Sequence, residues 1–238
     1  MSKLPKTDFP TSTFEVPTNK DQITLRPMKV SDEKILLMAK ESRSALELFK
    51  ATRQVLNNCI VGEYDLSKLA LVDINYLWIK LRTISLGDKV QIQYNDEEDN
   101  RLHVAGVDLS KIEIKWNTQS PKIKMTEANS LVLRIPSNDL YLSEVFDKED
   151  VSAEELMETL VIGVLDSYHV GKEVYDLKTL SHEEAVAFVD DLDVKTHKAV
   201  KEFIVNLPSI YLTSKYTNSM GTERKFEYKT LNDFFILP

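Results

Sequence analysis

Glycine is scarce in this chain, and long apolar runs are missing. Six glycines occur in 238 residues, and none lies in a G-x-G-x-x-G, P-loop or G-x-S-x-G pattern. Loops that cradle phosphate groups depend on such glycines, so nucleotide chemistry is not expected. No apolar run reaches the roughly 18 residues that a membrane-spanning helix needs, and the start MSKLPKTDFP lacks the apolar centre of a signal peptide. We therefore expect no membrane partner and a protein that stays in the cytoplasm where it is made.

Cysteines and paired histidines are lacking as well. The single cysteine, Cys59, cannot form a disulfide within the chain. Its setting in VLNNCIV favours a small buried hydrophobe in a reducing compartment over the alternative, a reactive thiol. The four histidines are His103, His169, His182 and His197, and no two have the i, i+4 spacing of a metal pair on a helix. We expect neither a metal ion nor a cofactor.

Acidic residues outnumber basic ones, 38 to 30, which gives a net charge of -8 and a pI near 5.2. This balance argues against a nucleic-acid partner. The densest acidic runs are Asp96–Asp99, in an expected hairpin turn, and Asp190, Asp191 and Asp193, at an expected helix end. We interpret both as solvated acids, with adventitious calcium as the alternative, since neither has the spacing of an EF-hand loop. A carboxyl pair across a cleft, as glycoside hydrolysis requires, cannot be located from sequence.

The first part of the chain, residues 1–86, reads as a short hairpin followed by helices. TFEV and QITLR predict two strands around a turn. Ser31 is the expected N-cap of a helix whose apolar face carries Ile35, Leu36, Met38 and Ala39. The segment ESRS at 41–44 predicts a break in the helical pattern, and a third helix is expected between a cap at Asp73 and an end at Gly87.

The remaining chain alternates between strand and helix patterns. Residues 87–146 alternate apolar and polar positions in KVQIQY, RLHVAGV, KIEIKW, KIKM and SLVLRI, which predicts an antiparallel sheet of four or five strands. Residues 147–238 predict helices over SAEELMETLVIGVLDSY, SHEEAVAFVDDL and VKTHKAVKEFIVNL, then a C-terminal hairpin. This order predicts an α+β fold, either as three regions or as one compact domain.

Two stretches repeat one pattern of strand, polar turn and strand after a helix. They are Leu86 to Leu109 and Tyr211 to Phe235, and we interpret them as two copies of one hairpin module. The second turn, TNSMG, has the outline of a zinc knuckle, but Thr217 and Met220 stand where the thiolates would be. An ordinary hairpin turn without zinc is therefore expected.

Three segments resemble the T4-like bacteriophage baseplate family, which contains hub subunits and hub-assembly proteins. They are LRPMKVSDEKILLMAKES at 25–42, DINYLWIKLRTISLGDK at 73–89 and LNDFF at 231–235. The resemblance implies a protein of viral tail assembly that works on other baseplate hub proteins through protein–protein contacts, without catalytic turnover. It also implies assembly in the host cytoplasm, and a place in the tail baseplate if the chain is retained. The alternatives are a permanent structural subunit of the hub and a tail-associated hydrolase.

Apolar and aromatic side chains are the best candidates for a partner surface. The chain ends in LNDFFILP, and so apolar an end either folds back on the core or docks into another subunit. Aromatic residues are enriched at interface hot spots, although Trp78 is expected in the core or at an interface. Whether the chain forms homo-oligomers is left open. The candidate partner-binding residues are Phe234, Phe235, Ile236, Leu237, Trp116 and Tyr211.

Overall fold

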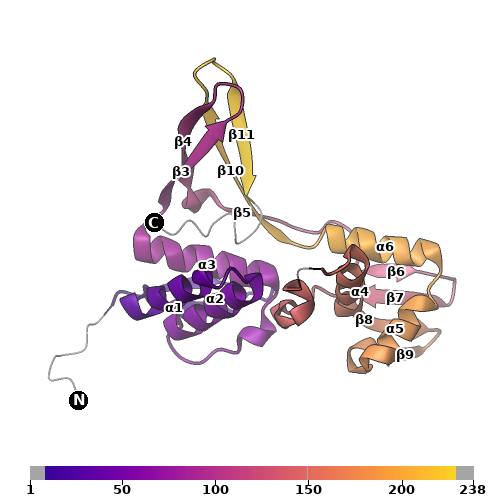
Figure 1. Ribbon diagram of the computed structural model, residues 1–238. Helices are drawn as coiled ribbons and strands as arrows, with labels where there is room; N and C mark the ends of the chain where they lie inside the picture. The colour runs from indigo at the N-terminus through magenta and orange to yellow at the C-terminus, as the bar shows by residue number, and fades with distance from the viewer. Residues whose placement is uncertain (1–8, 149, 229–238) are drawn as a thin grey trace. The chain divides into compact units, whose positions relative to one another are not determined.

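The computed structural model describes residues 9–148 and 150–228, and their contacts divide the chain into two units (Figure 1). Unit 2 is Trp116–Pro208, and unit 1 combines the chain on both sides of it. The mixed α+β class expected from sequence is confirmed. The three-part division at about residues 86 and 146 rests on local pattern and stays a prediction. Among the described residues, none of the helices combines the length and apolar character needed to cross a bilayer.

The described part of unit 1 contains three helices, three small antiparallel sheets and two 3-10 turns. Its helices are α1 (Val30–Glu41), α2 (Ala45–Cys59) and α3 (Leu71–Leu86), with 3-10 turns at Leu66–Lys68 and Leu109–Lys111. Its strands are β1 (Ser12–Glu15), β2 (Gln22–Leu25), β3 (Lys89–Asp96), β4 (Arg101–Asp108), β5 (Glu113–Lys115), β10 (Ser209–Thr217) and β11 (Glu223–Tyr228). The N-terminal hairpin, the break between α1 and α2 and the end of α3 at Gly87 are confirmed.

The N-cap of α1 is Lys29, two residues before the expected Ser31, because Asp32 and not Ser31 organises the first turn of the helix. The Asp32 carboxylate accepts hydrogen bonds from the Lys29 backbone N–H and from the Arg26 guanidinium, both at 2.9 Å. Arg26 also donates to the Asn58 carbonyl at the end of α2. The expected apolar face is only partly right: Leu36 is fully buried, whereas Met38 is 72% exposed.

Helix α3 starts before the expected cap as well, and Asp73 lies inside its first turn. The Asp73 carboxylate accepts from the Ala70 backbone N–H and from both the N–H and the hydroxyl of Thr18, which lies between β1 and β2. Burial raises the pKa of Asp73, and these donors offset part of that rise. Asp73 thus ties the N-terminal hairpin to the central helix.

The core of unit 1 surrounds α3. Trp78 is 2% exposed, so it belongs to the core and not to an interface surface. Cys59 is fully buried, and burial raises the pKa of its thiol to about 12, so the expectation of an unreactive buried hydrophobe is confirmed. Strands β5, β10 and β11 contribute to the same core through Ile114, through Ile210 and Leu212, and through Tyr228, respectively.

Unit 2 is a four-stranded antiparallel sheet with three helices. Its strands are β6 (Lys122–Lys124), β7 (Asn129–Leu133), β8 (Leu165–Val170) and β9 (Glu173–Asp176), in that order across the sheet. Its helices are α4 (Ala153–Val164), α5 (His182–Asp190) and α6 (Val194–Val205), with 3-10 turns at Asn138–Leu142, Glu144–Phe146 and Leu177–Thr179. Leu131, Leu133 and Leu165 of the sheet share one core with residues of α4 and α6.

Two sequence expectations about the strands are wrong. The middle strands do not form one sheet: β3 and β4 pair only with each other, β5 pairs with β10, and β6 and β7 belong to the sheet of unit 2. The helix expected to run through LDSY ends at Val164, and Leu165–Val170 is strand β8. An alternating pattern specifies that a segment is a strand, but the partner is set by packing far along the chain.

Candidate functional site

The most elaborate polar arrangement in the described chain lies between two hairpins of unit 1. Hairpin β3–β4 and hairpin β10–β11 lie side by side (Figure 1), and four of their aromatic rings are stacked nearly parallel. Tyr94 stacks on Phe226 with ring centroids 3.9 Å apart, and His103 stacks on Tyr216 at 5.0 Å. At the base of the stack, the hydroxyl of Tyr228 contacts those of Tyr94 and Ser214. The two modules recognised in the sequence therefore face each other.

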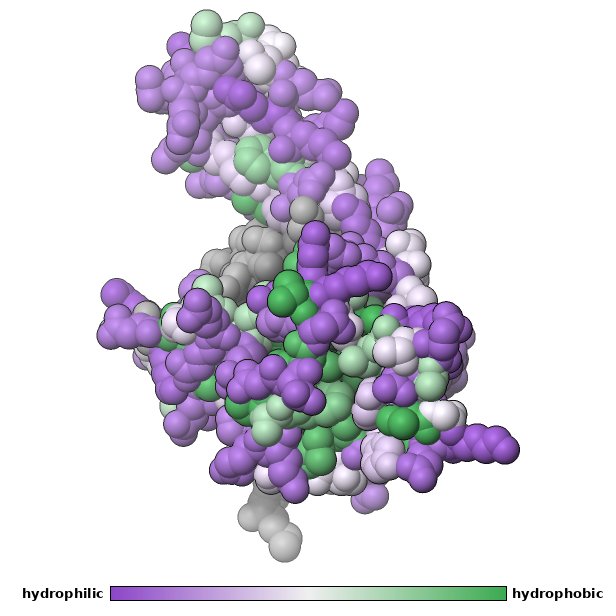
Figure 2. Space-filling model, turned by 90° about the vertical axis from the view of Figure 1, so that its right-hand side faces the viewer, coloured by the Kyte–Doolittle hydropathy of each residue, from purple (hydrophilic) through white to green (hydrophobic). Residues whose placement is uncertain are grey.

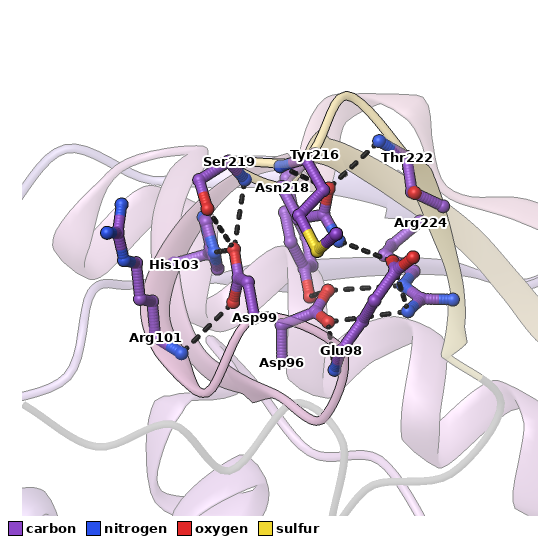
Figure 3. Close-up of polar contacts among 11 residues, drawn as sticks. Asp96, Glu98, Asp99, Arg101, His103, Tyr216, Asn218, Ser219, Thr222 and Arg224 are labelled. Carbon is purple, nitrogen blue, oxygen red and sulfur yellow. Dashed lines mark hydrogen bonds and ion pairs between the residues drawn. The ribbon is translucent and has the colours of Figure 1, made fainter.

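Polar side chains join the two turns beyond this stack (Figure 3). Asp96, at the end of β3, accepts from the Tyr216 hydroxyl at 2.6 Å and from Arg224 Nε at 3.1 Å. Glu98 accepts from the Asn218 amide at 2.7 Å and from Arg224 Nη2 at 3.0 Å. One arginine of the second hairpin thus bridges two carboxylates of the first, and its planar fork suits both.

Asp99 completes the contact on the other side of the turn. Its Oδ2 accepts from the backbone N–H and the hydroxyl of Ser219, at 2.9 and 2.8 Å, and lies 2.7 Å from His103 Nε2. Because a carboxylate only accepts, the Nε2 of His103 carries the proton. We call this set the hairpin clasp, and its members are Asp96, Glu98, Asp99, His103, Tyr216, Asn218, Ser219 and Arg224.

The clasp keeps its carboxyls ionised. The Arg224 guanidinium and the Tyr216 hydroxyl hold the pKa of Asp96 well below its ordinary range. Burial opposes the ionisation of Asp99, yet the hydrogen bonds from Ser219 and His103 lower its pKa to about 2. Burial and the neighbouring Asp96 carboxylate raise the pKa of Tyr216 to about 12. Each shift favours the protonation states in which the contacts form.

This arrangement is suited to holding two hairpins together and not to binding a small ligand. The carboxylate oxygens already accept from protein donors, and within residues 9–148 and 150–228 no group of three His, Cys, Asp or Glu side chains is placed to hold a metal ion. The second turn is a plain hairpin turn, as expected, with Gly221 at φ +87° and the Asn218 side chain accepting from the Thr222 N–H.

The interpretation of Asp96–Asp99 as solvated acids is wrong for Asp96 and Asp99. Asp96 is 3% exposed, the side chain of Asp99 is 4% exposed, and Glu98 is engaged by Arg224. Only Glu97 of the run is an exposed acid outside the clasp. The second run is solvated as expected, since Asp190, Asp191 and Asp193 are all exposed. The Asp193 carboxylate also caps α6 by accepting from the backbone N–H groups of Lys195 and Thr196.

The candidate partner-binding residues are not brought together by the described structure. Trp116 is 49% exposed in unit 2. Tyr211 belongs to β10 of unit 1, where its hydroxyl donates to Glu227 at 2.8 Å and the Lys115 ammonium lies 3.5 Å from the ring centroid. Phe234, Phe235, Ile236 and Leu237 lie outside the described residues.

Sequence reasoning missed the second half of the clasp. Tyr216, Asn218 and Arg224 were not singled out, because their partners lie 120 to 128 residues earlier in the chain. One signal was available: the acidic turn NDEEDN and the turn TNSMGTER, with its arginine and amide, are chemically complementary copies of the same module.

Comparison with known proteins is consistent with a structural role for such contacts. The family model described as T4 bacteriophage base plate protein matches residues 9–236. No curated protein and no solved structure matches the chain. The matched range covers both units and both hairpins of the clasp. The chain therefore belongs to the T4 bacteriophage base plate protein family.

Proposed function

We propose that this baseplate protein acts in assembly of the baseplate hub, through protein–protein contacts and without catalytic turnover. The observation that supports this most is the hairpin clasp, in which the densest run of acids is occupied by internal donors. A group that is already hydrogen-bonded within the fold is poorly placed for acid–base chemistry on a substrate. The same contacts give a rigid pair of hairpins, a suitable scaffold for recognition of other hub proteins.

We propose that the partner contacts use the residues selected from the sequence, each within its own unit. Trp116 offers an exposed aromatic ring, and the apolar residues Phe234, Phe235, Ile236 and Leu237 supply the side chains that interfaces favour. Tyr211 is the weaker member, because Lys115 and Glu227 already engage it. Homo-oligomer formation through the same residues is an additional possibility for the test.

Co-expression with individual hub proteins, followed by pull-down, tests this proposal. We expect one hub protein to co-purify with the full chain and to be lost when the chain is truncated after Thr230. Retention of the complex by the folded, truncated chain would remove the C-terminal residues from the interface. Trp116→Ser, checked for folding by circular dichroism, tests the second candidate separately.

We favour a transient assembly factor over a permanent hub subunit. A permanent subunit presents a large apolar interface, whereas this chain is strongly charged, with 29% Asp, Glu, Lys and Arg. The factor would act in the host cytoplasm and leave before the virion is complete. Quantitative mass spectrometry of purified virions decides between the two, because stoichiometric amounts of the chain in finished particles contradict the transient role.

A tail-associated hydrolase is the second candidate, and one pair of side chains gives it a definite test. Ser167 Oγ lies 3.0 Å from His169 Nε2 on the sheet of unit 2, a distance at which a histidine can activate a hydroxyl. A zymogram on peptidoglycan is expected to show no clearing. Clearing that disappears with Ser167→Ala would instead establish the hydrolase and overturn the proposal of a protein without turnover.

A further inference from the structure

Unit 2 has an open apolar groove between its sheet and α5. Figure 2 shows hydrophobic side chains gathered at the surface among hydrophilic ones. The groove has a volume of about 500 Å³. Tyr168 and Phe188 form its floor with their rings edge to face, 5.5 Å between centroids. The side chains that line it are Met125, Tyr168, Val170, Tyr175, Leu177, Leu180, Glu184, Phe188, Asp191 and Leu192.

An edge strand borders this groove. Within the described residues, strand β9 is the last strand of the sheet and pairs only with β8. All four of its residues are exposed, with Val174 at 61% and Tyr175 at 50%. Exposed edge strands offer backbone groups to which an extended segment can add. The opposite edge, β6, carries Lys122 and Lys124, charges of the kind that protect an edge from such pairing. Because Tyr175 belongs to β9 and also lines the groove, the two features are continuous.

Charge indicates what kind of segment fits. The two charged residues that line the groove, Glu184 and Asp191, are both acidic and exposed. Unit 2 as a whole has 18 acidic and 9 basic residues, a net charge of -9, while the rest of the chain has 20 acidic and 21 basic. All of the net negative charge therefore lies in unit 2, and it favours a basic partner.

We propose that unit 2 binds an extended, basic segment of a partner protein, with apolar side chains in the groove and lysine or arginine beside Glu184 and Asp191. The identification of the partner as a baseplate protein rests on the proposed function. The binding of a basic segment rests only on the groove and its charge. A second copy of unit 2 is disfavoured by repulsion between two units of charge -9. The chain's own end is poorly matched, since residues 229–238 contain one lysine and one aspartate.

Fluorescence anisotropy with the full chain tests this. The probe is a fluorescein-labelled, end-blocked ten-residue peptide of alternating Val and Lys, and its matched control carries Glu in place of Lys. We expect the lysine peptide to bind at least roughly tenfold more tightly than the glutamate peptide, and to weaken as salt is raised. No binding of the lysine peptide, or equal binding of both, would overturn the proposal.

Matched variants and hydrogen exchange locate the binding. Asp191→Lys is expected to weaken the lysine peptide roughly tenfold, and Glu202→Lys, an equal charge change on α6 away from the groove, by less than about threefold. Peptide binding should slow amide exchange in residues 173–176. Equal effects of both variants, or no slowing in β9, contradict the groove and edge as the site.

Two further outcomes identify a different occupant. Tighter peptide binding by a chain truncated after Thr230 would show that the chain's own end competes for the groove. A dimer that dissociates when the peptide is added would show that a second copy fills it. Either result overturns the proposal. Because no baseplate protein enters this assay, its failure leaves the co-expression test of the proposed function unaffected.

Discussion

Unit 1 and unit 2 place their carboxylates in different surroundings. The carboxylates buried in the described chain are those of Asp32, Asp73, Asp96 and Asp99, and all four belong to unit 1. Each accepts from a donor on another segment, respectively Arg26, Thr18, Arg224 and Ser219. None of the acids described in unit 2 is buried, although that unit carries 18 of the 38 in the chain.

The difference follows from how each unit is built from the chain. Unit 2 is one continuous stretch, and its sheet and helices close around an apolar core. Unit 1 must join segments separated by more than 90 residues, and the ion pair between Arg224 and the buried Asp96 joins two of them with a defined geometry that apolar contacts alone specify less well. Buried acids of unit 1 thus join parts of its fold, whereas the described acids of unit 2 lie at its surface.

The largest expected effect comes from the core of unit 1. Trp78→Ala removes a fully packed indole and should lower the free energy of unfolding of unit 1 by about 4 kcal/mol. Hydrogen exchange followed by mass spectrometry reads each unit separately, and we expect faster exchange in α2 and α3 with little change in β7 and β8. The matched variant Phe203→Ala should show the reverse. Faster exchange in both units with either variant would show that they unfold as one.

The next largest loss of stability is expected when the buried ion pair between Arg26 and Asp32 is broken. Asp32→Asn leaves the Arg26 guanidinium, with 17% of its side chain exposed, without its carboxylate and should cost about 3 kcal/mol in urea denaturation. Its neighbour Glu33 is exposed, so Glu33→Gln is the control and should change stability by less than about 0.5 kcal/mol. A loss of similar size in both variants would mean that helix-start charge, and not the ion pair, is responsible.

The clasp makes unit 1 sensitive to acid. Asp96 and Asp99 have folded-state pKa values below their ordinary value of about 4, so their contribution is present above that pH and is lost as the pH falls toward about 2. Exchange in β3, β4, β10 and β11 should therefore accelerate over this range before exchange in β7 and β8 does.

Two variants assign that acid sensitivity. Asp96→Asn combined with Asp99→Asn should be less stable at neutral pH and should lose the additional slope below pH about 4. Glu97→Gln removes an acid from the same turn without touching the clasp and should keep the slope. Persistence of the slope in the double variant would assign it to other carboxyls.

The smallest effects are expected on the surface of unit 2. Asp191→Asn and Asp190→Asn remove exposed charges and should each change the free energy of unfolding by less than about 0.5 kcal/mol in urea denaturation. A larger loss of stability in either variant would mean that these acids stabilise the fold. The two units would then not differ in how they use their carboxylates.

The sequence predicts local structure better than it predicts which distant segments pair. The hairpin strands, the break before Ala45 and the end of α3 at Gly87 depend on neighbouring residues, and these predictions are confirmed. The pairing of β5 with β10 depends on residues 94 positions or more away, and a period of two does not name a partner.

The site was less predictable for the same reason. Asp96 looked like a solvated acid because turns are usually exposed, and the partners that bury it, Tyr216 and Arg224, have no local signature. The run VIGVLDSY continued an apolar pattern without a proline, and its glycine, Gly163, lies inside α4, so no residue after Val164 marked the change from α4 to β8.

The insertion of unit 2 between β5 and β10 imposes an order on biosynthesis. At rates of about 5 to 20 residues per second, roughly 5 to 20 s separate the emergence of β5 from that of β10. During that interval the acidic turn of the first hairpin has been synthesised, but its partner Arg224 has not. By the end of the interval, unit 2 has all of its residues and can fold. Unit 1, which begins the chain, is therefore the last to be completed.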